Sequence, residues 1–424
     1  MANGLCWVIL GALLLVPLTH GNALGYVAML GAVGGFFVAD RPTYRAVLAM
    51  PQTQILVVAF VLLAIAIVAV SGPLSHDTLV AFDFTPFLLV IPANAVFLRA
   101  PIGRPALAIA VLSAGGAIVA LLVAGFQFVV LDNTRPGGWE LSPIHFADLA
   151  VTLGFLGLGG LLVETPPRWA ALLWLAPLAG LIAAILSGTR TALLVAVVEA
   201  VLAVIYFVRR YRLPLRTTLG AIIALVAAAV IVSLLAPVLH LGRAFDVIGV
   251  FEQLFSDQRV TDYTAGVRLD QYQAALKAIA NAPIFGHGWR DQVQSALQYM
   301  SPASQRAYAI EHWGYIHDEF LSFSVGMGFF GALSWVLMTA YPIVALVRAP
   351  ASSEPAARNY MTLVAWAGIL IGGLSDVLFN TELTKTFYCF IPGAIVILCS
   401  TRPLSLQHPA VLMDSVHASI GETP

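Results

Sequence analysis

Residues 53–70 read TQILVVAFVLLAIAIVAV, a run without a charged side chain. A helix needs about 20 predominantly apolar residues to cross the hydrocarbon core of a bilayer. Similar runs recur along the chain, without the alternation of apolar and polar residues that is typical of a membrane barrel. The chain is 60% hydrophobic and 10% charged, with a mean hydropathy of +0.90, whereas soluble domains carry about 25% charged residues. We therefore expect an all-α polytopic membrane protein.

The apolar runs predict about twelve transmembrane helices, of which the first and fourth are short. These helices are expected at residues 5–18, 23–39, 53–70, 85–97, 105–130, 144–163, 169–185, 189–208, 219–239, 317–346, 359–379 and 387–400. The expected regions are 1–239 with transmembrane helices 1–9, 240–316 as a periplasmic loop, 317–400 with helices 10–12, and 401–424 as a polar cytoplasmic tail. The first run is expected to be a span and not a secretory signal, because no basic residue precedes it and no cleavage site follows.

The distribution of basic residues supports this count and orients the chain. With both termini cytoplasmic, the short outer loops hold only Arg135, Arg190 and Lys385, as the positive-inside rule requires. The inner connections take Arg41, Arg45, Arg99, Arg104, Arg168, Arg209, Arg210, Arg212, Arg216, Arg348, Arg358 and Arg402. Long translocated loops are exempt from the rule, so the basic residues of the 240–316 loop do not conflict with this orientation.

The 240–316 loop is the longest polar interval of the chain, and its sequence predicts helices. Residues 269–280 have helical apolar spacing, and Asn281-Ala282-Pro283 would end this helix. A glycine-bracketed turn at 285–289 and a second helix at 291–300 follow. Too few apolar residues remain for an independent core, so we expect a helical cap on the membrane domain.

Arg190 is the first candidate site residue. It follows Ser187-Gly188-Thr189 at the start of a predicted span, where unpaired backbone amides and the helix dipole favour an anion. Its planar guanidinium can bind two phosphate oxygens at once. The alternative is an arginine that extends to lipid headgroups.

Arg268 and His317 are the other two candidates. Arg268 opens the predicted cap helix, and its alternative role is a surface ion pair with Asp270 or Asp262. His317 precedes a span, where an imidazole could act as a general base near neutral pH. Its alternative role is helix capping or an interfacial polar contact. His287 and His312 compete with it, and we expect both to be structural.

The depth of the ionisable residues favours catalysis over transport. Asp148 and Asp376 are expected near the outer ends of their spans, and only Glu199 is deep. A transporter would place several such residues at mid-depth, so Glu199 is assigned a structural role. The three cysteines lie in or beside apolar runs and do not have the spacing of a metal site. The sequence also lacks a stripe of basic residues of the kind that binds nucleic acid.

Three motifs in order carry a resemblance to a family. They are Ser-Gly-Thr-Arg-Thr-Ala at 187–192, Arg-Leu-x-x-Tyr with Pro-Ile-Phe-Gly-x-Gly-Trp at 268–289, and His317 followed by Gly-Met-Gly-Phe-Phe-Gly at 326–331. Together with the Arg135-Pro-Gly-Gly stretch and Ser142 to Ala147, this pattern resembles the bacterial O-antigen ligase and O-antigen polymerase superfamily, from about Arg135 onward.

The resemblance implies a metal-independent, inverting glycosyltransferase without a cofactor, which works at the periplasmic face of the bacterial inner membrane. Its donor would be a glycan linked to undecaprenyl pyrophosphate. Arg190 and Arg268 would bind the pyrophosphate, and His317 would deprotonate or orient the acceptor hydroxyl. Asp318 departs from the small amide or hydroxyl residue that many relatives carry after the histidine, which leaves the acceptor open.

The expected function is that of an O-antigen ligase, with lipid A core oligosaccharide as the acceptor. The first alternative is an O-antigen or exopolysaccharide polymerase, whose acceptor is another carrier-linked glycan. A polysaccharide flippase or transporter is the second alternative, and a deep cationic cavity across the bilayer would favour it. A non-catalytic assembly scaffold would leave Arg190, Arg268 and His317 far apart.

Overall fold

The computed structural model describes the chain except for residues 73–75, 213, 215, 217–262 and 401–424. The described residues form helices and connecting loops without strands, which confirms the predicted all-α class. The helical segments are α1 (Ala2–Leu10), η1 (Gly11–Leu15), α2 (Gly21–Val33), α3 (Gly35–Val38), α4 (Arg41–Leu48), α5 (Pro51–Ser71), η2 (His76–Phe84), α6 (Pro86–Arg99), α7 (Pro105–Val129), α8 (Pro143–Leu158), η3 (Gly159–Leu162), α9 (Pro167–Leu186), α10 (Arg190–Tyr211), α14 (Tyr263–Asn281), α15 (Gln292–Leu297), α16 (Pro302–Glu311), α17 (Glu319–Val347), α18 (Pro355–Gly373), η4 (Leu378–Asn380) and α19 (Glu382–Leu398).

Proline begins many of these helices, including α5, α7 and α8. The first helical position suits proline, because its missing N–H would have no partner within the helix. Eight described segments are long and apolar enough to cross a membrane, and a shorter apolar helix covers Ala2–Leu15. The predicted span at 219–239 lies outside the described residues, so the total of twelve stays a prediction.

Most predicted span boundaries agree with the helices to within a few residues. Two boundaries were wrong, because α19 begins at Glu382 and not at Phe387, and α18 ends at Gly373 and not at Phe379. The backbone leaves the helix after two consecutive glycines, Gly372 and Gly373, and residues 374–377 form a loop before η4. Apolar residues flank the two polar residues of this loop, Ser375 and Asp376, so hydropathy alone does not detect the end of the helix. The loop carries Asp376.

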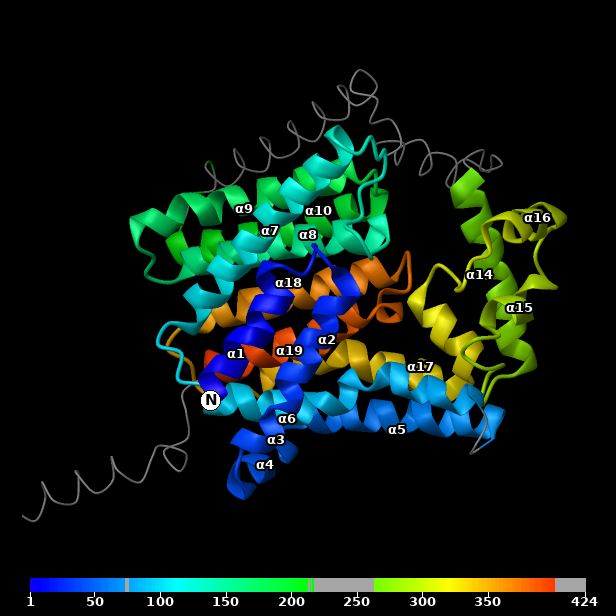
Figure 1. The fold of residues 1–424 in the computed structure, drawn as a ribbon, viewed down its shortest axis with the longest axis horizontal. Coiled ribbons are helices and arrows are strands. Elements are labelled where there is room, and N and C mark those ends of the chain that lie inside the picture. Colours follow the sequence, from blue (N-terminus) through cyan, green and yellow to red (C-terminus); the bar gives the residue numbers. More distant parts are fainter. Residues whose placement is uncertain (73–75, 213, 215, 217–262, 401–424) are drawn as a thin grey trace, which may run out of the picture.

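Helix α8 forms the centre of one half of the bundle. It packs against α7, α9, α10 and α18, and Figure 1 shows α7 to α10 gathered on one side of the molecule. Its residues from His145 to Leu158 are all buried. Close packing depends on glycine at two crossings, because a Cβ on Gly154 would lie 2.7 Å from the Ala176 carbonyl oxygen and one on Gly180 would lie 2.3 Å from that of Ala150. Small residues allow such close approach between membrane helices.

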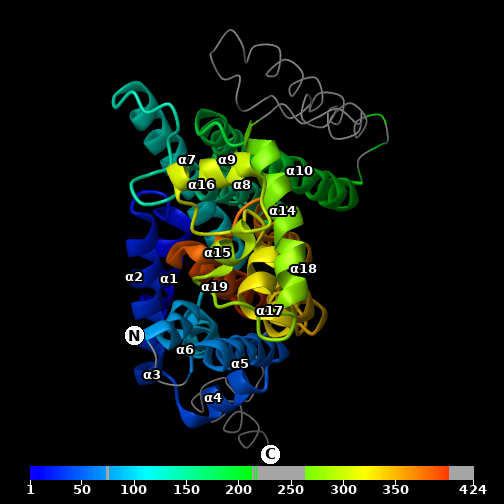
Figure 2. The same cartoon turned by 90° about the vertical axis from the view of Figure 1, so that its right-hand side faces the viewer.

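Helices α14, α15 and α16 cover one end of the bundle. We call residues 263–316 the cap, and Figures 1 and 2 both show it beside α17. The helix predicted at 269–280 is confirmed as part of α14, and the helix predicted at 291–300 is confirmed in the shorter α15. Helix α16 was missed, because its polar sequence from Pro302 to Glu311 lacks a clear apolar face. The first part of the predicted loop, 240–262, lies outside the described residues.

Backbone hydrogen bonds between two glycine-rich segments, residues 283–288 of the cap and residues 325–329 of α17, hold the cap against α17. The backbone N–H groups of His287 and Gly288 donate to the carbonyl oxygens of Val325 and Gly326, at 2.9 and 2.8 Å, and Phe329 N donates to Pro283 O at 2.8 Å. Gly328 has φ +59° and interrupts α17 at this point. This interruption leaves peptide groups of α17 free to pair with the 283–288 segment.

Side chains are excluded from this contact. Gly286 has φ +72°, and a Cβ there would lie 2.4 Å from the backbone nitrogen of Met327. A Cβ on Gly328 would lie 2.5 Å from the carbonyl carbon of Ile284. The two glycine motifs seen in the sequence therefore contact each other. The contact requires a residue without a side chain at Gly286 in one motif and at Gly328 in the other.

Gly286→Ala is expected to destabilise the protein by about 3 kcal/mol. The alanine would have to adopt a left-handed backbone conformation, and its Cβ would clash with the backbone of α17. Denaturant titration in detergent micelles measures the effect. Gly314→Ala is the matched control, because no atom lies within 4 Å of a Cβ at that cap position. Equal stability of the two variants would contradict the proposed role of the contact.

Candidate active site

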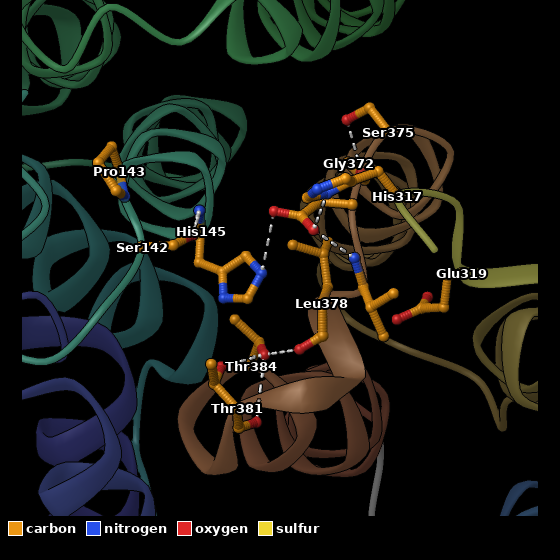
Figure 3. Close-up of polar contacts among 12 residues, drawn as sticks. Ser142, Pro143, His145, His317, Glu319, Gly372, Ser375, Leu378, Thr381 and Thr384 are labelled. Carbon is orange, nitrogen blue, oxygen red and sulfur yellow. Dashed lines mark hydrogen bonds and ion pairs between the residues drawn. The ribbon is translucent and has the colours of Figure 1, made fainter. Parts of the chain in front are cut away.

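Asp376 is the centre of a polar cluster at the cap end of the bundle. It lies in the loop between α18 and α19 and is 7% exposed. Its Oδ1 is 3.1 Å from His317 Nδ1, and its Oδ2 is 3.6 Å from His145 Nε2. Figure 3 shows the imidazoles of His145 and His317 approaching this carboxylate from different sides. Asp376 Oδ1 also accepts a hydrogen bond from Val377 N at 2.9 Å.

Hydrogen bonds around the two histidines fix their backbone positions. The hydroxyl of Ser142 caps α8 and accepts from His145 N at 3.3 Å. Tyr272 of α14 donates its hydroxyl to the carbonyl oxygen of His317 at 2.6 Å, and His317 N donates to Gln271 Oε1 at 3.3 Å. The cap therefore holds one histidine, and the bundle holds the other.

The alternative role of His317 as a helix cap was wrong. Asp318 caps α17 instead, because its carboxylate accepts from Leu321 N at 2.7 Å. The imidazole of His317 is free to face Asp376 and remains partly accessible, with 24% of the side chain exposed. Since Asp376 accepts a hydrogen bond from Nδ1, the neutral tautomer has its proton there and its lone pair on Nε2.

The charge state of Asp376 follows from its partners. Burial acts to raise the pKa of Asp376, but the hydrogen bond from His317 and the nearby imidazole of His145 outweigh it and lower the pKa to about 2. The carboxylate therefore stays ionised through the physiological pH range. It can hold the His317 tautomer and stabilise a protonated imidazole.

Arg268 lies on α14, one turn before Gln271 and Tyr272. Its side chain interacts electrostatically with Tyr272 and with Asp148 of α8. The Nε atom is buried and has no hydrogen-bond partner among the described residues. The alternative pair with Asp270 is not favoured, because Asp270 accepts from Ser301 N at 2.8 Å, beside the start of α16. Asp262, the other partner considered, lies outside the described residues.

Arg190 begins α10 at the same end of the bundle. The preceding residue, Thr189, donates its hydroxyl to the carbonyl oxygen of Pro143 at 3.1 Å, and Ser187 donates to the Thr189 hydroxyl at 2.9 Å. These bonds join the turn before Arg190 to the first turn of α8, which carries His145. The following residue, Thr191, lies close to Asp148.

Asp148 connects these residues to the cluster. It interacts electrostatically with both Asp376 and Arg268, and it is buried at 3% exposure. Space for its carboxylate depends on Gly372, since a Cβ there would lie 2.7 Å from Asp148 Oδ2. The predicted residues Arg190, Arg268 and His317 thus occupy one region around Asp148 and Asp376, although they are distant in the sequence.

The remaining ionisable candidates have structural positions. Glu199 accepts a hydrogen bond from Thr152 at 2.9 Å inside the bundle. This donor could not be predicted from the sequence. The ring of His287 contacts the carbonyl oxygen of Ala278 at 2.9 Å within the cap. His312 ends α16 in a left-handed conformation. Of the residues that the structure describes, no three His, Cys, Asp or Glu side chains are grouped to hold a metal ion.

His145 and Asp376 were not among the residues predicted to form the site. Both were visible as ionisable residues at the ends of apolar runs, which is a general signal for function in membrane proteins. That signal does not say which of them meet. The contact joins residues 145, 317 and 376, and only the packing of α8, the cap and the α18–α19 loop brings them together.

Comparison with known proteins identifies a family over part of the chain. Residues 175–336 match the family model described as O-Antigen ligase, a segment that includes Arg190, Arg268 and His317. A relative described as an uncharacterized protein of Haemophilus influenzae (strain ATCC 51907 / DSM 11121 / KW20 / Rd) is 25% identical over 267 residues, which cover 62% of this chain and 64% of that relative. The family match confirms the resemblance to the O-antigen ligase superfamily.

The lowered pKa of Asp376 predicts a pH-dependent contribution to stability. The folded pKa of about 2 lies below the ordinary value of 3.8, so the contribution is complete above pH 4 and is lost as the pH falls toward 2. The shift corresponds to about 2 kcal/mol. We expect wild type to exceed Asp376→Asn by about that amount near pH 6, with the difference vanishing near pH 2.

Denaturant titrations of both proteins across this pH range test the expectation. Asp132→Asn is the control, because Asp132 is an exposed carboxylate of a loop, and its substitution should leave the stability unchanged at every pH. A difference between wild type and Asp376→Asn that stays constant from pH 6 to 2 would contradict the ionised pairing.

Proposed function

We propose that the protein is an O-antigen ligase that transfers glycan from undecaprenyl pyrophosphate to the lipid A core oligosaccharide at the periplasmic face of the bacterial inner membrane. The observation that carries the proposal is the bond between His317 and Asp376, beside the α14 helix that carries Arg268. The family match over residues 175–336 supports the same reaction type.

The proposed chemistry assigns a separate task to each side chain. Arg190 and Arg268 bind the pyrophosphate of the donor, and their positive charge stabilises the negative charge that grows on it as the glycosidic bond breaks. His317 Nε2 accepts the proton of the acceptor hydroxyl. Asp376 acts as a positioning residue, because its carboxylate holds the Nδ1 proton of His317.

The bond changes balance without a further reactant. The acceptor oxygen forms a bond to the anomeric carbon of the donor sugar, and the bond from that carbon to the pyrophosphate oxygen breaks. The electron pair leaves on the pyrophosphate, while the acceptor proton moves to His317. Attack from the face opposite the leaving group inverts the anomeric centre, and the two guanidinium groups supply the positive charge that a metal ion supplies in other enzymes.

The packing beneath the site favours an enzyme over a flippase. Helix α8 begins at the His145 end of the cluster and is buried along its length. It contacts four other helices. The one deep acidic residue, Glu199, has a hydrogen bond to Thr152 and lies in this packed interior. A transport path would need polar groups facing an opening at this depth.

A null strain tests the reaction. We expect it to make carrier-linked glycan but to show lipopolysaccharide without long chains on a gel, because the final transfer is lost. Arg190→Ala, Arg268→Ala and His317→Ala should each fail to restore the long chains. Arg306→Ala is the control, since Arg306 is an exposed arginine of the same cap, and it should restore them.

The outcomes separate the alternatives. Long chains attached normally in the null strain would reject ligation. Shortened glycan on the carrier itself would indicate a polymerase, whose acceptor is another carrier-linked glycan. Loss of carrier-linked glycan from the periplasmic leaflet would indicate a flippase.

Transfer by the purified protein is expected to continue unchanged in the presence of a chelator, because the arginines provide the charge stabilisation. The measurement is the rate of glycan transfer in detergent with and without EDTA. Arg268→Ala should lower the rate by about 100-fold whether or not chelator is present. Inhibition by EDTA that is reversed by a divalent ion would disprove the metal-independent mechanism.

A further inference from the structure

A polar cavity is lined in part by η4, which directly follows the loop that carries Asp376. Its volume is about 240 Å³, and it is open on one side. Its walls come from α2, η2, the cap turn, η4 and α19, and its lining residues are Asn22, Tyr26, Asp83, Phe84, Trp289, Phe379, Asn380, Glu382 and Lys385. Pockets for drug-sized ligands have volumes of about 300–1,000 Å³. This cavity therefore suits a ligand of about one sugar ring and not a lipid chain.

The charges of the cavity argue against an anion. The buried ammonium of Lys385 donates to Glu382 Oε1 at 2.7 Å and to the carbonyl oxygen of Asp83. Glu382 thereby offsets the charge of Lys385, and Asp83 adds a second carboxylate. The three side chains carry a net charge of −1, which would repel a pyrophosphate. The two arginines of the candidate site, in contrast, favour one.

The same groups suit a neutral ligand with many hydroxyls. Carboxylates accept hydrogen bonds from hydroxyls, and the amides of Asn22 and Asn380 both donate and accept. Asn22 is held in place, because its Oδ1 accepts from Glu382 N at 2.9 Å. Its amide nitrogen is then the group directed to a ligand. Hydrogen bonds to charged acceptors are the stronger kind, so Asp83 is expected to contribute most.

Aromatic rings provide the apolar part of the wall. Trp289 contacts Phe84 edge to face, with ring centroids 5.5 Å apart, and it contacts Phe323 at 5.0 Å. These contacts fix the indole at the cavity. Rigid aromatic rings with a few convergent polar groups are typical of small-molecule sites, and the C–H faces of a sugar ring can pack on them.

Two short segments connect the cavity to the cluster. The loop before α17 carries Tyr315 and His317, and the loop before α19 carries Asp376 and Asn380. Tyr315 hydrogen-bonds with Asn380, and burial raises the pKa of Tyr315, which the carboxylates of Asp83 and Asp376 raise further. The Tyr315 phenol therefore contacts the cavity residue Asn380 and lies near enough to Asp83 and Asp376 to interact electrostatically with both. Since Tyr315 is two residues from His317, the loop before α17 joins the cavity to the cluster.

We propose that this cavity binds the acceptor sugar, and that Asp83 and Asn380 hold its hydroxyl groups while a neighbouring hydroxyl faces His317. This inference rests on the proposed glycosyl transfer and adds the location of the acceptor. The two substrates are then separated by charge, with the anionic donor at the arginines and the neutral ring at the carboxylates.

Transfer kinetics test the inference. The probe is lipid A core purified from the null strain, used at varied concentration with the carrier-linked donor fixed, and then in the reverse arrangement. Asp83→Asn and Asn380→Ala should each raise the KM for the acceptor by about tenfold, as expected for one lost hydrogen bond. The KM for the donor should stay the same. Asp132→Asn, on an exposed loop outside the cavity, should change neither KM.

An unchanged acceptor KM in both cavity variants of an active enzyme would overturn the inference and leave the proposed function standing. A rise in donor KM instead would assign the cavity to the donor and would also overturn it.

Equilibrium titration of the same probe into His317→Ala decides the question without turnover. We expect binding to persist in His317→Ala and to weaken about tenfold when Asp83→Asn is added. Equal affinity with and without Asp83→Asn would contradict the inference. Absence of transfer by wild type would reject the proposed function alone, because this titration still measures the cavity.

Discussion

A buried carboxylate places a strong constraint on this fold. Moving an ionised group out of water is costly unless partners replace the lost hydration. Asp376 meets this requirement with His317, His145 and the N–H of Val377. These partners come from the segment before α17, from α8 and from its own loop. The requirement therefore fixes three parts of the chain relative to one another at the point where we place the chemistry.

Hydrogen bonds to the backbone hold the cap against the His317–Asp376 cluster. The pairing of residues 283–288 with the interrupted part of α17 fixes the far end of the cap, and Tyr272 and Gln271 fix α14 against His317. Arg268 lies one turn from these two contacts. A displacement of the cap would therefore move Arg268 and the His317 backbone together. Preorganisation of this kind suits a reaction in which charge stabilisation and proton removal must coincide.

Positive and negative side chains lie in different parts of the proposed site. Arg190 lies at the start of α10 and Arg268 lies within α14, where the donor pyrophosphate is proposed to bind, and carboxylates line the cavity between α2 and α19. His317 lies between the two groups in the proposed arrangement. Opposite charge preferences keep each substrate out of the other's site, so specificity comes from repulsion as well as from attraction.

The sequence by itself determined the class, the approximate spans and the α14 helix, because apolar length is a local property. It also singled out Arg190, Arg268 and His317 as candidates, and their roles stay a prediction. The glycine motifs were also visible, but their contact with each other was not. Only the tertiary structure decided that Asp376 pairs with His317 and lies against His145, that α18 ends early, and that Asp83, Asn380 and Lys385 line one cavity. These results depend on contacts between residues up to about 300 positions apart, as in the bond from Lys385 to Asp83. Periodicity and composition carry no information on such pairs, since packing alone brings them together.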